Sequence, residues 1–260
     1  MSKSKIFVVL LAVLLLFSAS ACGSSAPDME ILKVGVKSDV LGFGELDITT
    51  NEYKGFEIAL AKLIAKELTG DENKIEFVTV TTNTRGVLLD NGDIDLVIAT
   101  FTVTEERKLS YNFSTVYYTD AVGLLVKKDS GIKDLKDLNG KVIGVNMAAT
   151  SKDAILEALA GDEELKDIKV TFKEFTSYAD IQAALGNGQV DVFSVDKSIL
   201  RIYMDESTEI LPVNLKRQPY GIASKLDNKE LAEKVDKLIV KWLEDGTIKK
   251  LTEEYGINID

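Results

Sequence analysis

Residues 95–113 read DLVIATFTVTEERKLSYNF, and this stretch gives the strongest indication of the fold. Its apolar start, DLVIAT at 95–100, is typical of a buried strand. Thr100 and Thr102 follow at the end of that strand, and Arg107 lies in the turn beyond. Open α/β sheets bind ligands outside the carboxyl ends of their strands. Hydroxyls, peptide N–H groups and a guanidinium at such an end predict a site for a small carboxylate.

On both sides of this stretch, short β-like runs alternate with helical patterns. Apolar residues recur at helical spacing over 55–68 and 231–246, which predicts two helices with one buried face each. Further strands are predicted at 31–36, 75–80, 141–145, 169–175 and 190–195. The alternation predicts an α/β protein with parallel sheets. The pattern is built twice, over about 31–117 and again over about 131–211.

The N-terminus predicts export. The apolar run from Ile6 to Phe17 is too short to cross a bilayer but suits the apolar part of a secretory signal. We therefore expect residues 1–21 to be a signal peptide. Cys22, the only cysteine, follows small residues in a context that resembles a bacterial lipobox. This predicts a lipid on Cys22 and a membrane tether over residues 22–29.

The charge and the length narrow the class of protein. The net charge is −11, and removal of the predicted signal, which carries two lysines and no acids, makes it −13. With no basic stretch, this balance argues against a nucleic-acid partner. The roughly 235 residues that remain suffice for one large hydrophobic core or two ordinary ones.

Four charged side chains follow predicted strands or open predicted helices: Lys37, Arg85, Arg107 and Asp196. Three positive charges and one negative charge complement a ligand with two carboxylates and one ammonium, which describes glutamate or aspartate. The alternative is that Arg85 and Arg107 are solvated surface residues. Both arginines are poorly matched to a helix N-terminus, where the dipole favours acids, so a bound anion explains them better.

Three polar residues are candidates for helix N-caps. Thr104 is expected to cap the EERK turn. Thr150 and Asp196 precede predicted helices and fit either a capping role or a ligand contact. The sequence leaves this choice open for both.

Six segments carry a resemblance to a known family: KGFEIALAKLIAKEL (54–68), LLDNGDIDLVIATFTVTEERK (88–108), YNFSTVYY (111–118), LKDLNGKVIGV (135–145), VDVFSVDKS (190–198) and QPYGIA (218–223). Their order and spacing resemble the solute-binding proteins of polar amino-acid ABC importers, bacterial extracellular solute-binding protein family 3. The resemblance spans nearly the whole predicted mature chain. GVKSDV (35–40) and TRGVLLDNG (84–92) are most similar to the aspartate/glutamate-binding branch.

The resemblance implies a two-lobed, periplasmic-binding-protein-like fold of type II. Each lobe would be a mostly parallel sheet flanked by helices. Lobe 1 would comprise residues 30–118 and 220–260, and lobe 2 would comprise residues 119–219. Two strand-like crossings, near 117–122 and 215–221, would form a hinge.

The resemblance also implies roles for individual residues. It assigns the ligand α-carboxylate to Arg107, with help from the Thr102 hydroxyl and from Thr150 on the second lobe. It assigns the α-ammonium to Asp196.

For the rest of the ligand, the resemblance implies that Lys37 and Arg85 read the side-chain carboxylate. Phe43, shortly after the first strand, would pack on the ligand. The remaining ligand-binding candidates from the matching segments are Thr100, Phe101 and Tyr220.

These expectations describe a monomeric lipoprotein, anchored outside the bacterial cell membrane or in the periplasm. It would capture glutamate or aspartate between its lobes and deliver it to an ABC permease, with no cofactor and no metal. Glutamine, cystine or another polar amino acid is the alternative ligand. A dehydratase-like enzyme is the alternative activity, but the chain has no histidine, and Glu174 and Asp196 are the acids to consider for it.

Overall fold

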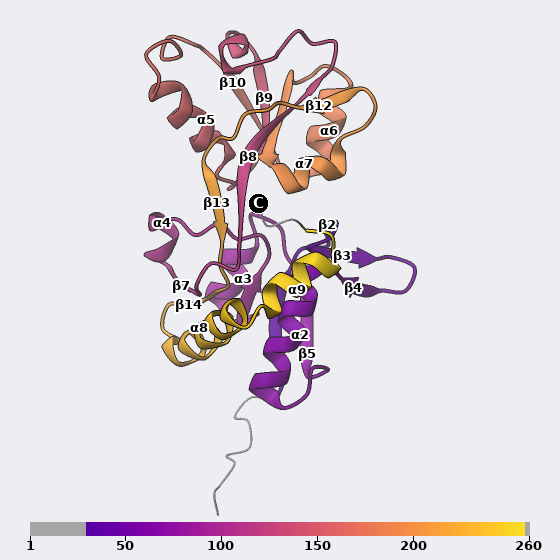
Figure 1. Ribbon diagram of the computed structural model, residues 1–260, viewed down its shortest axis with the longest axis vertical. Helices are drawn as coiled ribbons and strands as arrows, with labels where there is room; N and C mark the ends of the chain where they lie inside the picture. The colour runs from indigo at the N-terminus through magenta and orange to yellow at the C-terminus, as the bar shows by residue number, and fades with distance from the viewer. Residues whose placement is uncertain (1–29, 258–260) are drawn as a thin grey trace, which may run out of the picture.

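The computed structural model describes residues 30–257. Two lobes lie one above the other along the long axis, connected by strands β8 (Tyr118–Lys127) and β13 (Arg217–Tyr220) (Figure 1). The predicted signal peptide, 1–21, and the predicted tether that starts at Cys22 lie outside the described residues. Within the described chain, no helix combines the length and the hydrophobicity that a bilayer crossing requires.

Lobe 1, the lower lobe in Figure 1, is built on a five-stranded sheet of order β5-β1-β6-β14-β7. Its strands are β1 (Leu32–Val36), β5 (Ile75–Thr79), β6 (Leu96–Ile98), β7 (Tyr111–Phe113) and β14 (Ala223–Lys225). β1 runs parallel to β5 and β6, whereas β14 pairs antiparallel with β6 and β7. The helices of this lobe are α2 (Phe56–Thr69), α3 (Arg85–Asn91), α4 (Glu105–Lys108), α8 (Lys229–Glu244) and α9 (Thr247–Glu254).

Lobe 2 is built on a sheet of order β10-β9-β11-β8-β12. Its further strands are β9 (Val142–Asn146), β10 (Thr171–Phe175), β11 (Val192–Asp196) and β12 (Thr208–Ile210). The helices are α5 (Ser151–Ala160), α6 (Tyr178–Gly186), α7 (Lys197–Tyr203) and the 3₁₀ turn η1 (Leu135–Leu138). β10, β9 and β11 are parallel, and β8 runs antiparallel to β11 and β12.

Both sheets are therefore mixed, and the expected parallel pairing is limited to three strands in each lobe. The reason lies in the crossings. β8 enters lobe 2 from the other lobe, and β14 follows β13 back into lobe 1 (Figure 1), so each runs against the strands already there. Antiparallel pairing needs no helical crossover. Strands that pair in this way are therefore not marked in the sequence by the alternation of strands and helices that predicts a parallel sheet.

The two connecting strands pair with each other. β8 and β13 are antiparallel, with Tyr118 opposite Tyr220 and Ala121 opposite Arg217. The loop after β6 is tied to the same ribbon, because the Val103 N–H donates to the carbonyl of Pro219 at 2.7 Å. Residues 102–107, which follow β6, thus lie at the junction of the two lobes.

Helix α2 follows the predicted periodicity. Phe56, Leu60 and Ile64 are fully buried on one face. The helix begins after Gly55, whose φ of 122° is open to glycine, and a Cβ there would lie 2.4 Å from the carbonyl oxygen of Phe43. The prediction of a helix over 55–68 is confirmed.

The predicted C-terminal helix is also confirmed. α8 buries Val235, Ile239 and Trp242 along one face and ends two residues before Gly246, which has a φ of 81°. A small third sheet, β2 (Asp39–Val40), β3 (Gly44–Asp47) and β4 (Glu52–Lys54), lies beside lobe 1 (Figure 1). It contains the glycine-rich loop that follows the first strand.

Candidate functional site

A cleft of about 950 Å³ lies between the lobes. Lobe 1 lines it with residues 102–107, lobe 2 with residues 148–150, and the connecting strand β13 with Gln218. Thr102, Arg107 and Thr150 are therefore brought to one cleft from both lobes. Seven further candidates are buried and are not among the residues that line this cleft: Lys37, Phe43, Arg85, Thr100, Phe101, Asp196 and Tyr220.

Arg107 connects the two lobes. Its Nη1 donates to the carbonyl oxygen of Thr102 at 2.8 Å, and its Nη2 donates to the carbonyl oxygen of Ala148, in lobe 2, at 3.1 Å. Thr104 caps helix α4, since its hydroxyl accepts from the Arg107 N–H at 3.1 Å. The capping role predicted for Thr104 is confirmed.

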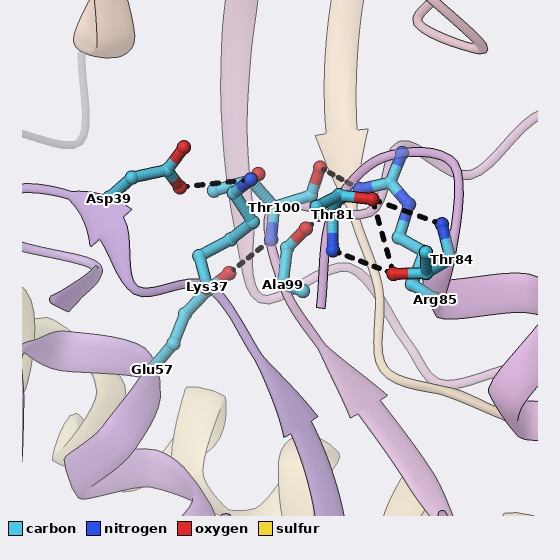
Figure 2. A network of polar contacts seen from close by, with 8 residues as sticks. All are labelled: Lys37, Asp39, Glu57, Thr81, Thr84, Arg85, Ala99 and Thr100. Carbon is cyan, nitrogen blue, oxygen red and sulfur yellow. Dashed lines mark hydrogen bonds and ion pairs between the residues drawn. The ribbon is translucent and has the colours of Figure 1, made fainter. Parts of the chain in front are cut away.

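Arg85 is buried, so its interpretation as a solvated surface residue is wrong. Its Nη1 donates to the carbonyl oxygens of Ala99, at 2.8 Å, and Thr100, at 3.3 Å (Figure 2). Its Nε is buried and has no hydrogen-bond partner among the described residues. Nη1 of the guanidinium is thus held by neutral carbonyls, while the Nε–H is a donor that no described residue accepts.

Phe101 lies against two guanidinium groups. The Arg85 Cζ is 4.0 Å from the centroid of its ring, and the Arg107 Cζ is 4.7 Å from it. The aromatic face attracts both cations and brings them together. Burial lowers the pKa of Arg107, and the neighbouring Arg85 lowers it further. Because an arginine stays protonated in proteins, the two cations create a strongly positive environment.

Lys37 is a third buried cation, at the end of β1. Its Nζ forms an ion pair with Asp39 at 2.9 Å (Figure 2) and lies 5.1 Å from the ring centroid of Tyr178, in α6 of lobe 2. Burial lowers the pKa of Lys37, and the Asp39 carboxylate opposes this. Tyr178 was not predicted as a site residue, and its position as the first residue of a helix after a strand is the signal that could have found it.

Thr100 has a strained backbone and an occupied N–H. Its φ is 45°, which is uncommon for a residue other than glycine. Its N–H donates to Glu57 Oε1 at 2.7 Å, and the same oxygen accepts from the Tyr117 hydroxyl at 2.5 Å. The Thr100 N–H is therefore already hydrogen-bonded to a carboxyl group of the protein. Glu57 was not predicted, because its place in the α2 pattern gives no sign of a buried charge.

Asp196 and Tyr220 are buried together. The Tyr220 hydroxyl donates to Asp196 Oδ2 at 2.5 Å, and Asp196 forms no side-chain cap on helix α7. The capping interpretation is therefore wrong for Asp196. Burial raises the pKa of Asp196 to about 7, and Asp120 adds to the shift, while the Tyr220 hydrogen bond and the arginines oppose it. A buried carboxyl of this kind is stabilised in its ionised form by an ammonium.

Gln218 joins the hydroxyls of the two lobes. Its Oε1 accepts from the Thr102 hydroxyl at 2.8 Å and from the Thr150 hydroxyl at 2.6 Å. Thr150 forms no side-chain cap on helix α5, so its capping interpretation is also wrong. Gln218 is fully buried and was not predicted, since the sequence places it only in a connecting segment.

Residues 32–258 match the sequence pattern of the bacterial extracellular solute-binding proteins, family 3. The chain belongs to this family. A relative, the glutamine-binding protein GlnH of an ABC transporter in Bacillus subtilis (strain 168), is 35% identical over 269 aligned positions, which cover 95% of this chain and 94% of the relative. The predicted family is thus correct, while this relative is named for glutamine.

Two solved structures share the fold of this family 3 protein. An ancestral arginine-binding protein bound to arginine is 35% identical, with a TM-score of 0.76 over 87% of this chain and 98% of that one. An ancestral amino-acid-binding protein, described as a precursor of cyclohexadienyl dehydratase, is 31% identical, with a TM-score of 0.74 over 87% and 95%. The predicted two-lobed α/β fold is confirmed.

Phe43 lies in the core of this family 3 protein, away from the cleft lining. It is buried, and its ring centroid is 6.1 Å from that of Phe56, 5.1 Å from Tyr118 and 6.0 Å from Tyr220. These edge-on contacts hold the glycine-rich loop against the aromatic core. The expected packing of Phe43 on a ligand is corrected to a role in the aromatic core behind the site.

Three cations and one buried carboxyl group are gathered in and behind the cleft of this family 3 protein. Arg85, Arg107 and Lys37 carry positive charge, and Asp196 carries a carboxyl group whose pKa is raised to about 7 by burial. Within the part of the chain that the structure describes, no group of three or more His, Cys, Asp or Glu side chains is arranged to hold a metal ion.

Proposed function

We propose that this family 3 protein captures a free acidic amino acid, glutamate or aspartate, between its lobes and delivers it to the permease of an ABC transporter. The observation that carries the proposal is the environment of Arg85. Its hydrogen-bond partners are neutral carbonyls, and none of the ion pairs within residues 30–257 includes it. An unpaired buried charge costs several kcal/mol, and a ligand carboxylate beside Arg85 would offset that cost.

The other polar groups support the same ligand. We propose that Arg107 and Thr150 hold its α-carboxylate, that Asp196 holds its α-ammonium, and that Lys37 assists Arg85 at the second carboxylate. The ligand would then contact both lobes at once. Shared contacts favour the closed arrangement, so binding would shift an equilibrium between open and closed lobes. The bends would fall near residues 117–122 and 215–221, where β8 and β13 connect the lobes.

Glutamine is the principal alternative ligand, because the relative from Bacillus subtilis is a glutamine-binding protein. A glutamine amide has the shape of the glutamate carboxylate but no charge, so Arg85 would have no ion-pair partner beside a bound glutamine, whereas Lys37 is already paired with Asp39. We therefore expect the ionised side chain to be preferred. Cystine carries a second carboxylate but also a second ammonium, which Arg85 and Lys37 would repel, so we expect it to bind less well than glutamate.

Isothermal titration calorimetry tests the proposal with glutamate, aspartate, glutamine and cystine on the wild-type protein. Arg85→Ala should weaken glutamate binding by roughly 3–5 kcal/mol, since it removes a buried partner of the carboxylate. Arg201→Ala is the matched control, because Arg201 is exposed on α7. Near-unchanged glutamate affinity in Arg85→Ala would contradict the assignment, as would a wild-type protein that prefers glutamine.

The proposal includes export and anchoring. We infer that residues 1–21 are removed and that a lipid on Cys22 holds a monomer at the outer face of the cell membrane or in the periplasm. Cys22→Ala should release the exported protein from membranes into the soluble fraction. An unchanged membrane fraction would remove the lipid from the proposal.

An enzyme on the same fold is a second candidate, favoured by the similarity to a precursor of a dehydratase. Of the two acids considered for it, Glu174 is exposed and forms an ion pair with Lys152 at 3.0 Å, so Asp196 is the acid that we retain for this alternative. We expect no turnover when the protein is incubated with each amino acid that it binds. NMR of the mixture would detect a product.

A further inference from the structure

The carboxyl group of Glu57 is fully buried beside the site. Its Oε1 accepts two hydrogen bonds, from the Thr100 N–H and the Tyr117 hydroxyl, while its Oε2 is buried with no partner among the described residues. A buried carboxylate is costly unless it is paired and hydrogen-bonded. The position of Glu57 in the first turn of α2 favours the ionised form, but only half of the group is satisfied.

Glu57 and Arg85 hold the two ends of one peptide group. Glu57 accepts from the N–H of Thr100, and Arg85 donates to the carbonyl of Ala99, which belongs to the same peptide (Figure 2). A negative group on the N–H and a positive group on the carbonyl polarise this peptide in one direction. The charge of Glu57 therefore acts on Arg85 through a single rigid unit. Lys37 is also within its electrostatic reach.

We propose that Glu57 is a specificity-determining residue: its negative charge offsets the positive charge of Arg85 and Lys37 and so limits the preference for a dicarboxylic amino acid over its amide. The inference rests on the proposed function, since it concerns the same site. A neutral Glu57 leaves the cations uncompensated, which strengthens their attraction for a second ligand carboxylate. Glutamine, whose side chain is neutral, responds much less.

The ionisation of Glu57 gives the proposal a pH dependence. Burial raises the pKa of Glu57 to about 7, against the Tyr117 and Thr100 hydrogen bonds and the cations Arg85 and Lys37. Below that pH, Glu57 is neutral and the preference for glutamate over glutamine is high. Above it, Glu57 is ionised and the preference falls. Bound glutamate favours the neutral form, so its binding takes up protons near pH 7.

Other groups near Glu57 can be separated from it. Asp196, whose pKa is also raised to about 7, is proposed to pair with an α-ammonium that glutamate and glutamine share, but its charge also acts on Arg85 and would change the affinity ratio in the same direction as Glu57. Tyr117 stays protonated, because burial raises its pKa well above the ordinary value. Lys37, with its partner Asp39, would change the ratio in the same direction as Glu57. A variant of Glu57 distinguishes these sources.

Glu57→Gln is that variant, because a glutamine retains an oxygen acceptor for Thr100 and Tyr117 and removes only the charge. Calorimetry of glutamate and glutamine from about pH 6 to about pH 8.5 gives the affinity ratio of the wild type and the variant. In the wild type, the preference for glutamate should fall about tenfold over this range. In Glu57→Gln it should stay at or above the wild-type value at low pH. Glu67→Gln, exposed on the same helix, should behave as the wild type.

A purely structural role for Glu57 predicts a different result. Both ligands would then weaken alike in Glu57→Gln, and the pH dependence of the ratio would persist, which would overturn the proposal. If the variant does not fold, proton uptake by the wild type decides. Titrations at about pH 7 in two buffers of different ionisation enthalpy should show more uptake with glutamate than with glutamine, and equal uptake would also overturn it. A wild type that prefers glutamine at every pH contradicts the proposed function. It does not by itself contradict the role of Glu57, which is tested by how the ratio of the two affinities changes with pH.

Discussion

Replacement of Gln218 by methionine should weaken the connection between the lobes. The Gln218 oxygen accepts from Thr102 on lobe 1 and from Thr150 on lobe 2. Methionine is similar in size but offers only a weak sulfur acceptor. Thr102 is buried, so its unpaired hydroxyl should cost about 1–3 kcal/mol, whereas the half-buried Thr150 can reach water at a cost of about 1 kcal/mol. The free energy of unfolding should therefore fall by about 2–4 kcal/mol in total.

Equilibrium unfolding in guanidinium chloride measures this change. Gln189→Met is the matched control, because Gln189 is exposed and its replacement should leave the free energy of unfolding close to that of the wild type. Combining Gln218→Met with Thr150→Val should show a coupling of about 1 kcal/mol, since both substitutions remove the same hydrogen bond. The reasoning fails if Gln218→Met changes the free energy of unfolding by less than about 0.5 kcal/mol. It also fails if the two substitutions are additive.

Two other predictions follow from the structure. Because burial raises the pKa of Asp196 to about 7, the carboxylate that an ammonium needs is lost below that pH. Glutamate and glutamine affinities measured by calorimetry should each fall with a shared dependence approaching tenfold per pH unit below about 7, and Asp196→Asn should remove it. Gly55→Ala combines a φ of 122° with a Cβ 2.4 Å from a backbone oxygen and should lower the free energy of unfolding by about 3 kcal/mol. Gly140→Ala, with a φ of 74° and no atom within 4 Å, should cost only about 1 kcal/mol by the same measurement.

The edge of the sheets at which polar residues gather was predictable from the sequence. Apolar runs predict β1, β6, β9 and β11, and parallel strands place their carboxyl ends at one edge. Lys37, Thr100 and Asp196 could therefore be selected with no knowledge of a tertiary contact. Their selection depends on periodicity and on strand direction, both of which are local properties of the chain.

The partners of these residues were not predictable, because they come from distant segments. Thr150 and Asp196 each stand where a helix cap is expected, and a cap is a local interaction that the sequence can suggest. In the structure both hydrogen-bond instead with residues of β13, Gln218 and Tyr220. The same holds for Glu57. The helical pattern around it does not predict that the Thr100 N–H, from a distant segment, donates to its carboxyl group.

The route of the chain between the lobes has a consequence for how the protein folds. Lobe 2 is formed by one continuous segment, whereas the sheet of lobe 1 receives β14 only after lobe 2 has been completed in the sequence. β14 inserts between β6 and β7, and α8 and α9 then cover the lobe. Contacts between distant segments form slowly, because a long loop must close first. Lobe 2 should therefore fold first, and a chain that ends before β14 should leave lobe 1 open and prone to aggregation.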